Sequence, residues 1–209
     1  MTTTNTPAHE RLSQAHMRPL AEFAQRLRDK AGVEFGIPPD YVPNFDPDNG
    51  GVLARALFLM EAPGPGAVKS RIVSPSNNDQ TAKNLKRLFD NAGIAPGEII
   101  LWNIVPWYVG TGTKIRPVNS EDLRHARPYL LELLALLPEL RVIVLLGNKA
   151  KRGWAEAGLN VSVVSTYHPS PLVFNTSPER EPKTQEAFNE AAALIRSNAE
   201  PCKPNIGGR

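Results

Sequence analysis

Four short polar segments of the chain contain the residue types from which a catalytic or binding site could be built. They are Glu61-Ala62-Pro63-Gly64, the residues from Asn103 to Trp107, Gly147-Asn148-Lys149, and the residues from Tyr167 to Pro171. Together they supply a histidine, a carboxylate, a side-chain amide and a lysine. Such groups can donate and accept hydrogen bonds, orient a water molecule and stabilise developing charge. The sequence therefore predicts a polar functional site in these segments.

Each of these segments directly follows a short apolar run. The runs cover residues 54–60, 99–102, 142–146 and 161–165. Helical patterns alternate with them, at about 81–92, 121–137, 149–157 and 179–196. Short apolar runs separated by helices are typical of parallel strands buried on both faces. The sequence predicts an α/β three-layer sandwich with a central, mainly parallel four-stranded sheet flanked by helices. Ligands bind such sheets at the carboxyl ends of the strands, where the four segments converge.

Length and composition predict one folded domain of ordinary size. The chain has 209 residues, 41% of them hydrophobic and 22% charged, with a formal net charge of +3. We expect a single domain over residues 1–198 that begins with an amphipathic helix at about 9–31, and a flexible tail over 199–209. No apolar stretch approaches the roughly 20 residues of a membrane span, and residues 1–12 do not show the charged region followed by an apolar region that is expected of a secretion signal. We therefore expect a cytoplasmic monomer with no membrane partner.

The cysteine content limits the cofactors that the chain could carry. Cys202 is the only cysteine in the sequence. One chain can therefore form no disulfide and cannot assemble a cysteine-based zinc or iron–sulfur site. We expect no metal or redox cofactor.

Four sequence motifs together resemble those of a known family. They are EAPG at 61–64, ILWN at 100–103, LLGNKAKRG at 145–153 and HPSPL at 168–172. In this order, after successive strands, they resemble the uracil-DNA glycosylase superfamily, and the similarity covers about residues 54–196. HPSPL is the most specific of them and looks like the leucine loop of that family. The resemblance implies a DNA repair enzyme that hydrolyses the N-glycosidic bond of uracil in DNA, with free uracil and an abasic site as products.

The resemblance gives His168 and Asn103 their expected roles. The histidine of HPS in that family donates a hydrogen bond to the uracil carbonyl, where negative charge develops as the C–N bond breaks. Removing such a donor typically costs about 2.7 to 4 kcal/mol. The Asn103 amide would read uracil, which offers the O4 acceptor and the N3–H donor, and would reject cytosine. The alternatives are that His168 caps a loop and that Asn103 caps the turn that follows its strand.

Glu61 is the carboxylate of the first motif, and its expected role is to orient water and to stabilise the cationic sugar. The best-known branch of the family has GQDPYH at this place. Aligning the prolines puts Ala62 where that branch has its Asp, and Gly64 where it has the Tyr that excludes the 5-methyl group of thymine. Because Glu61 is displaced by one residue, two alternatives stay open. Asp79 could be the acid, or Glu61 could bind backbone amides structurally.

Two further features of the family are missing from the sequence. The iron–sulfur branch, which shares EAPG, uses four cysteines that this chain cannot supply. The family also stacks a Phe on uracil from the segment after the first motif, but residues 62–88 contain no aromatic residue. Trp107 or Tyr108 could provide that face, or could equally belong to the core or the rim. Further substrate contacts are expected from Ala62, Pro63, Gly64 and Ser170.

DNA contacts are expected in the third and fourth segments. Leu172 stands where the family inserts a side chain into the space left by a flipped base. Gly147, Asn148, Lys149 and Lys151 would line the phosphate backbone, although a run of charge is more often a solvated face. Two other functions stay open at this point. One is a module that binds uracil-containing or damaged DNA with little turnover. The other is an α/β hydrolase or nucleotide-binding protein that acts on a small molecule.

Overall fold

A four-stranded parallel sheet forms the centre of the protein. The computed structural model describes residues 8–111, 114–157, 163–197 and 201. The sheet contains β2 (Ala56–Met60), β4 (Ile99–Asn103), β7 (Val142–Leu146) and β8 (Val163–Thr166). Their order is β4-β2-β7-β8, and all neighbours are parallel. The predicted α/β fold class is therefore confirmed. The expected tail, apart from residue 201, and the first two residues of the expected run 161–165 lie outside the described residues.

The chain order of the strands creates a crevice at the carboxyl end of the sheet. The first of these strands, β2, lies between β4 and β7, so the chain leaves β2 on one side and later returns on the other. Connections that diverge in this way open a space between neighbouring strand ends, and this space is where open α/β sheets bind ligands. All residues of β4 and β7 are buried. Rows of buried aliphatic side chains on both faces give the site above them a rigid support.

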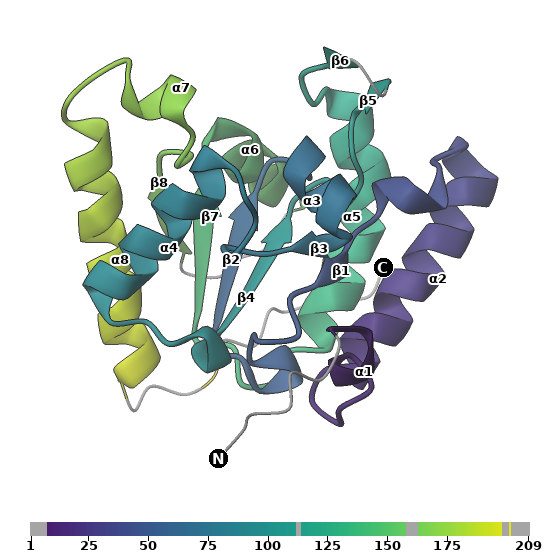
Figure 1. Cartoon of the computed structure of the whole chain (residues 1–209), viewed down its shortest axis with the longest axis horizontal. Coiled ribbons are helices and arrows are strands. Elements are labelled where there is room, and N and C mark those ends of the chain that lie inside the picture. Colours follow the sequence, from purple (N-terminus) through teal and green to yellow (C-terminus); the bar gives the residue numbers. More distant parts are fainter. Residues whose placement is uncertain (1–7, 112–113, 158–162, 198–200, 202–209) are drawn as a thin grey trace.

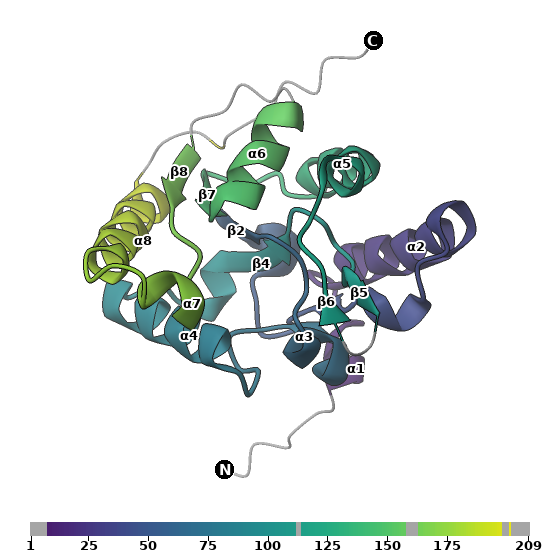
Figure 2. The same ribbon diagram turned by 90° about the horizontal axis from the view of Figure 1, so that it is seen from above.

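Helices cover both faces of the sheet (Figures 1 and 2). On one face, α4 (Gln80–Ala92) and α8 (Arg180–Arg196) contact each other, and α8 also contacts β7 and β8. On the other face lie α2 (Arg18–Phe35), α5 (Ser120–Ala135) and α6 (Asn148–Ala157). These three layers are the sandwich that the alternating pattern predicts.

Aromatic side chains fill the space between the layers on both sides of the sheet. The ring of Phe58 lies 4.8 Å from Phe89 of α4 and 5.0 Å from Phe188 of α8. On the opposite face, Trp102 stacks on Phe45 with ring centroids 3.7 Å apart. All five are buried. Aromatic pairs of this kind contribute roughly 0.5 to 1.5 kcal/mol beyond the burial of their area.

The N-terminal region differs from the expected helix over 9–31. A short helix, α1 (Ala8–Arg11), is separated from α2 by turns, and α2 continues to Phe35. The break lies just before Pro19, which fits the first turn of α2 but would remove a hydrogen bond from a helix interior. Gly36 ends α2 in the left-handed conformation, with φ of 65°, and this cap accounts for the later end.

Several short elements surround the sheet. The pair β1 (Asn44–Phe45) and β3 (Ile72–Val73) is parallel, and β5 (Gly110–Thr111) pairs antiparallel with β6 (Lys114–Ile115). The short helices are α3 (Pro65–Ser70), α7 (Pro171–Phe174), and the 3₁₀ turns η1 (Pro39–Tyr41), η2 (Gly51–Leu53) and η3 (Pro96–Glu98). In Figure 1, α3, α7 and the β5–β6 hairpin lie at the top, around the carboxyl end of the sheet. In the part of the chain that the structure describes, no helix combines the length and the apolar character of a membrane span.

Candidate active site

The four predicted segments meet at the carboxyl end of the sheet. The residues after β4 run beside those after β2, because the Ile104 amide donates to the Met60 carbonyl at 2.8 Å. The residues after β7 and β8 are joined in the same way, since the Gly147 amide donates to the Thr166 carbonyl at 3.0 Å. Backbone hydrogen bonds thus extend the sheet beyond the last strand residues. The segments that carry Asn103, Glu61, Gly147 and His168 are fixed relative to one another.

Asn103 is the last residue of β4 and has no partner for its side chain. Only 2% of the residue is exposed, and neither the amide nitrogen nor the amide oxygen makes a hydrogen bond within the described structure. An unpaired buried polar group costs about 1 to 3 kcal/mol. A native fold keeps such a group where a ligand or water completes its hydrogen bonds. The amide therefore offers a free donor and a free acceptor to a bound molecule.

Asn103 lines a cavity of about 120 Å³, which we call the inner cavity. One water occupies roughly 30 Å³ in the liquid, so the space is larger than a single water requires. His168 lines it together with Asn103. The other lining residues come from the end of β2, the first motif, α3, β3, the loop after it and α4: Met60, Ala62, Pro63, Gly64, Ala67, Val73, Ser74, Asn77, Asp79, Thr81, Ala82 and Leu85. The inner cavity thus combines two side-chain amides, one imidazole and one carboxylate with mainly apolar walls.

The His168 ring is uncharged at neutral pH. Burial disfavours the imidazolium and lowers the pKa of His168 from 6.5 to about 4. A neutral imidazole has one N–H donor. This donor can form a hydrogen bond with an oxygen on which negative charge develops. Since it lines both the inner cavity and a groove on the surface, His168 stands at the boundary between them.

Gly147 determines how closely the chain after β7 approaches His168. A Cβ atom at Gly147 would lie 2.9 Å from the Cβ of His168, and Gly147 has φ of 92°. Both the contact and the left-handed backbone favour glycine. The third motif therefore supports the histidine of the fourth by backbone packing.

The loop that carries His168 is also fixed from α4. The side-chain amide of Asn84 donates to the carbonyl of Pro169 at 2.8 Å, and Asn84 is buried. Ser170 begins α7 as its N-cap, with its hydroxyl accepting from the Val173 amide at 3.4 Å. The sequence analysis did not single out Asn84. Its signal is a polar residue on the buried face of a helix, between Ala82 and Leu85.

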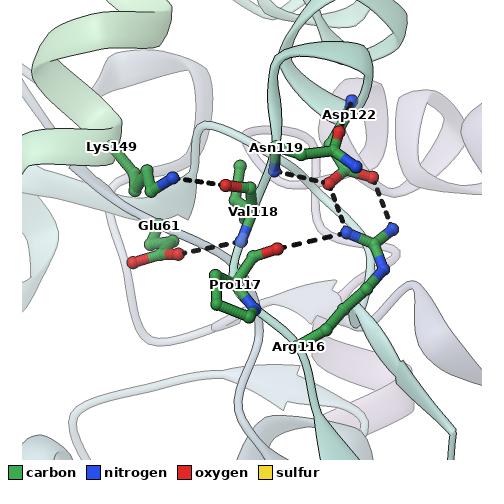
Figure 3. A network of polar contacts seen from close by, with 7 residues as sticks. All are labelled: Glu61, Arg116, Pro117, Val118, Asn119, Asp122 and Lys149. Carbon is green, nitrogen blue, oxygen red and sulfur yellow. Dashed lines mark hydrogen bonds and ion pairs between the residues drawn. The ribbon is translucent and has the colours of Figure 1, made fainter.

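Glu61 and Lys149 bind the backbone of the same residue, Val118 (Figure 3). One carboxylate oxygen of Glu61 accepts from the Val118 amide at 3.3 Å, and the Lys149 ammonium donates to the Val118 carbonyl. Val118 follows the β5–β6 hairpin, where Arg116 forms a bidentate pair with Asp122 at 2.5 and 2.7 Å. The Arg116 guanidinium and the Asn119 amide hold the pKa of the Asp122 carboxyl below its usual range despite burial. Glu61 thus has one oxygen on a backbone amide and a second oxygen for another partner.

Asp79 lines the inner cavity, whereas Glu61 does not. Asp79 is the N-cap of α4, and one of its oxygens accepts from the Ala82 amide at 3.0 Å. Its other oxygen lies against α3, where a Cβ at Gly66 would come within 2.5 Å of it. Each of the two candidate acids therefore uses one oxygen on backbone, but they face different spaces.

The structure does not bring Trp107 to the inner cavity. Trp107 is 2% exposed and packs between Phe35 and Tyr129, with ring centroids 5.9 and 6.2 Å away. Tyr108 contacts Tyr41 and lines a separate cavity of about 500 Å³ together with Trp107. No Phe, Tyr or Trp is among the described residues that line the inner cavity. The stacking face expected from Trp107 or Tyr108 is therefore replaced there by aliphatic side chains.

The outer groove lies on the other side of His168 and has a volume of about 430 Å³. Leu172 projects from α7 at its rim and is 79% exposed. The lining residues are Glu61, Gly147, Asn148, Lys149, Tyr167, His168, Ser170, Leu172, Val173 and Arg180. Lys151, one of the expected DNA contacts, does not line the groove but lies 5.9 Å from the ring of Tyr167. Most expected DNA contacts therefore surround one concave surface next to the inner cavity.

Comparison with protein families agrees with this arrangement. Residues 47–193 match the family model of the Uracil DNA glycosylase superfamily, which is more than half of the 209-residue chain. The chain belongs to the uracil DNA glycosylase superfamily. A comparison with curated proteins finds no match.

Two features separate this superfamily member from the branches that its motifs resemble. Four thiolates cannot come from one cysteine, and the described residues contain no group of three or more His, Cys, Asp or Glu side chains that could hold a metal ion. The residues present therefore do not fit an iron–sulfur cluster. Gly64 stands in place of a bulky aromatic residue, and a Cβ added there would meet nothing within 4 Å. The wall of the inner cavity beside Gly64 is open.

Proposed function

We propose that this superfamily member is a monofunctional uracil-DNA glycosylase, which hydrolyses the N-glycosidic bond of uracil in DNA and leaves an abasic site. The observation that carries the proposal is the buried Asn103 amide, whose two polar atoms are unpaired beside an uncharged His168. An amide can donate to O4 of uracil and accept from its N3–H. Membership of the superfamily supports glycosylase chemistry on DNA.

In this proposal, the base leaves the duplex and enters the inner cavity while the DNA backbone lies in the outer groove. A base inside the stack cannot reach a cavity of this kind, so it has to be flipped out, at a cost of a few kcal/mol. Leu172, exposed on α7, fills the vacated space. The open wall beside Gly64 leaves room at that position, so pyrimidines with a 5-substituent belong among the substrates to be tested.

The bond between C1′ of the sugar and N1 of uracil then breaks, and both electrons go to the base. His168 donates its N–H to the carbonyl oxygen on which this charge develops. The sugar becomes an oxocarbenium-like cation, and a water oxygen attacks C1′. Glu61 orients that water and stabilises the cation, because it lines the groove on the sugar side of His168. The water loses its proton to the carboxylate, and the uracil anion takes up a proton as it leaves.

The alternative is a DNA-binding module with little turnover. It is favoured by Ala62 at the position of the usual Asp, and by the engagement of Glu61 with the Val118 amide. An oligonucleotide with one uracil, incubated with the protein and then cleaved with alkali, separates the two. The glycosylase yields a cleaved strand at the uracil, whereas a pure binding module retards the DNA without cleavage. Matched oligonucleotides with cytosine, thymine or 5-hydroxymethyluracil define which bases are accepted.

A further inference from the structure

Two cations from opposite faces of the sheet converge on one aromatic ring beside the outer groove. Tyr167 directly precedes His168 and is partly buried. The Lys151 ammonium, from α6, lies 5.9 Å from the centre of its ring, and the Arg180 guanidinium, from α8, lies 5.2 Å from it. Both are within the range in which a cation is attracted to the face of an aromatic ring.

Neither of these cations forms an ion pair in the part of the chain that the structure describes. Arg180 donates to the neutral carbonyl of Val173 at 3.3 Å. Basic residues next to them along the same helices are neutralised. Arg152 pairs with Glu156 at 2.7 Å, and Lys183 pairs with Glu179 at 2.8 Å. Two like charges held near one ring repel each other, so an anion bound between them would lower their free energy.

We propose that Lys151, Tyr167 and Arg180 form a site for a single phosphodiester group of the DNA strand that carries the target base. The proposal rests on the proposed function and names a contact for the strand outside the inner cavity. Arg180 and Tyr167 line the same groove as His168 and Leu172, so a phosphate here would be close to a nucleotide whose base has entered the cavity.

The chemistry of the three side chains favours a phosphate over a stacked base. Guanidinium groups bind phosphate oxygens through parallel N–H donors, and lysine adds a compact positive charge. The ring of Tyr167 already has two cations against it, which leaves less of it for a neighbouring base. Its function in the site is to hold the two cations together in the absence of a carboxylate.

The test is the salt dependence of DNA binding by the full chain, on oligonucleotides without uracil so that excision cannot interfere. One phosphate contact contributes about 0.9 to the slope of log affinity against log salt for duplex DNA, and about 0.7 for a single strand. Lys151→Gln and Arg180→Gln should each lower the slope by up to that amount. The double variant should lose no more than about 0.9 on duplex DNA, because both side chains bind the same phosphate. Arg180→Lys should keep most of the slope.

Arg152→Gln is the matched control, since it removes a neighbouring charge of α6 that Glu156 already neutralises, and its slope should equal that of the wild type. An unchanged slope in Lys151→Gln and Arg180→Gln would overturn the proposal, and so would a double variant whose slope on duplex DNA falls by clearly more than the roughly 0.9 of one phosphate. Uracil release, measured on the same proteins, keeps the two proposals apart. A reduced slope in variants of a wild type that releases no uracil would support the phosphate site and contradict the glycosylase. Uracil release by the wild type, together with an unchanged slope in the variants, would support the glycosylase and contradict the phosphate site.

Discussion

The side chain of His168 can donate a hydrogen bond although its ring carries no charge. Its ring is uncharged at neutral pH because burial lowers its pKa to about 4, and it borders the cavity that contains the unpaired Asn103 amide. We expect His168→Ala to lower the single-turnover rate of uracil excision by at least about 100-fold, since one donor to a developing oxyanion is worth that much. The melting temperature at neutral pH controls for folding. A variant that excises at the wild-type rate would remove His168 from the chemistry.

Glu61 and Asp79 can be separated because each uses one oxygen on a backbone amide and they face different spaces. Glu61→Gln and Asp79→Asn keep those acceptors and remove only the charge, and Asn is as good an N-cap as Asp. We expect Glu61→Gln to slow excision by about 100-fold or more, because Glu61 lines the groove where the sugar lies, and Asp79→Asn to have a much smaller effect. Single-turnover rates with uracil in single-stranded DNA measure both. The opposite order would make Asp79 the group that orients water.

The sequence predicted the positions of Asn103 and His168 better than that of Trp107. Asn103 and His168 were placed together because each follows an apolar run, and such runs end at one edge of a parallel sheet. Trp107 is only four residues beyond Asn103, but its ring turns into the space between α2 and α5. The direction in which such a side chain points depends on the packing of helices that are far away in the sequence. The spacing of residues along the chain does not reveal it.

At the level of elements, α7 exposes the apolar side chain of Leu172 to solvent, so packing in the core does not account for a leucine at this position. The side chain is 79% exposed at the rim of the outer groove. If it fills the stack after extrusion of the base, Leu172→Ala should slow excision from duplex DNA at least about 10-fold more than excision from a single strand, because only the duplex loses pairing and stacking. The ratio of the two rates is the measurement. Equal losses on both substrates would exclude the wedge.

The long elements could be predicted because their patterns are continuous. The run at 142–146 is β7 itself, and the patterns at 81–92 and 179–196 match α4 and α8 to within one residue. The pairs β1–β3 and β5–β6 were missed, since strands of two residues carry no periodicity. The division of the N-terminal helix was missed as well. Pro19 permits a helix start as readily as it signals a break, and Gly36 competes with Gly32 as the cap.

For the whole molecule, the lowered pKa of His168 predicts a loss of stability in acid. The unfolded chain binds a proton to this ring below about pH 6.5, but the folded chain does so only near pH 4. Stability therefore falls as pH decreases from about 6.5 to about 4, by about 3 kcal/mol from this group. His168→Gln should lose less stability than the wild type over this interval, as measured by denaturant unfolding at each pH. Burial raises the pKa of Asp46, and this changes the free energy of unfolding with pH in the opposite direction. Asp46 is present in both the wild type and His168→Gln, so its effect cancels in the comparison.

Equal pH dependence in the two proteins would mean that the His168 ring is accessible to protons in the folded state. The same burial governs catalysis, since the neutral donor persists until the pH approaches 4. Excision should therefore show no loss attributable to His168 between pH 8 and about 5.

The most direct test of the central claim is to identify the base that the protein releases from DNA, by mass spectrometry, for the wild type and for Asn103→Asp. The wild type should release uracil and leave an abasic site in equal amount. A carboxylate at position 103 accepts where the amide donates, so it loses the bond to uracil O4 and can accept from the amino group of cytosine. The variant should therefore lose uracil release or gain cytosine release. A wild type that releases no uracil, or a variant that releases it at the wild-type rate, would contradict the account.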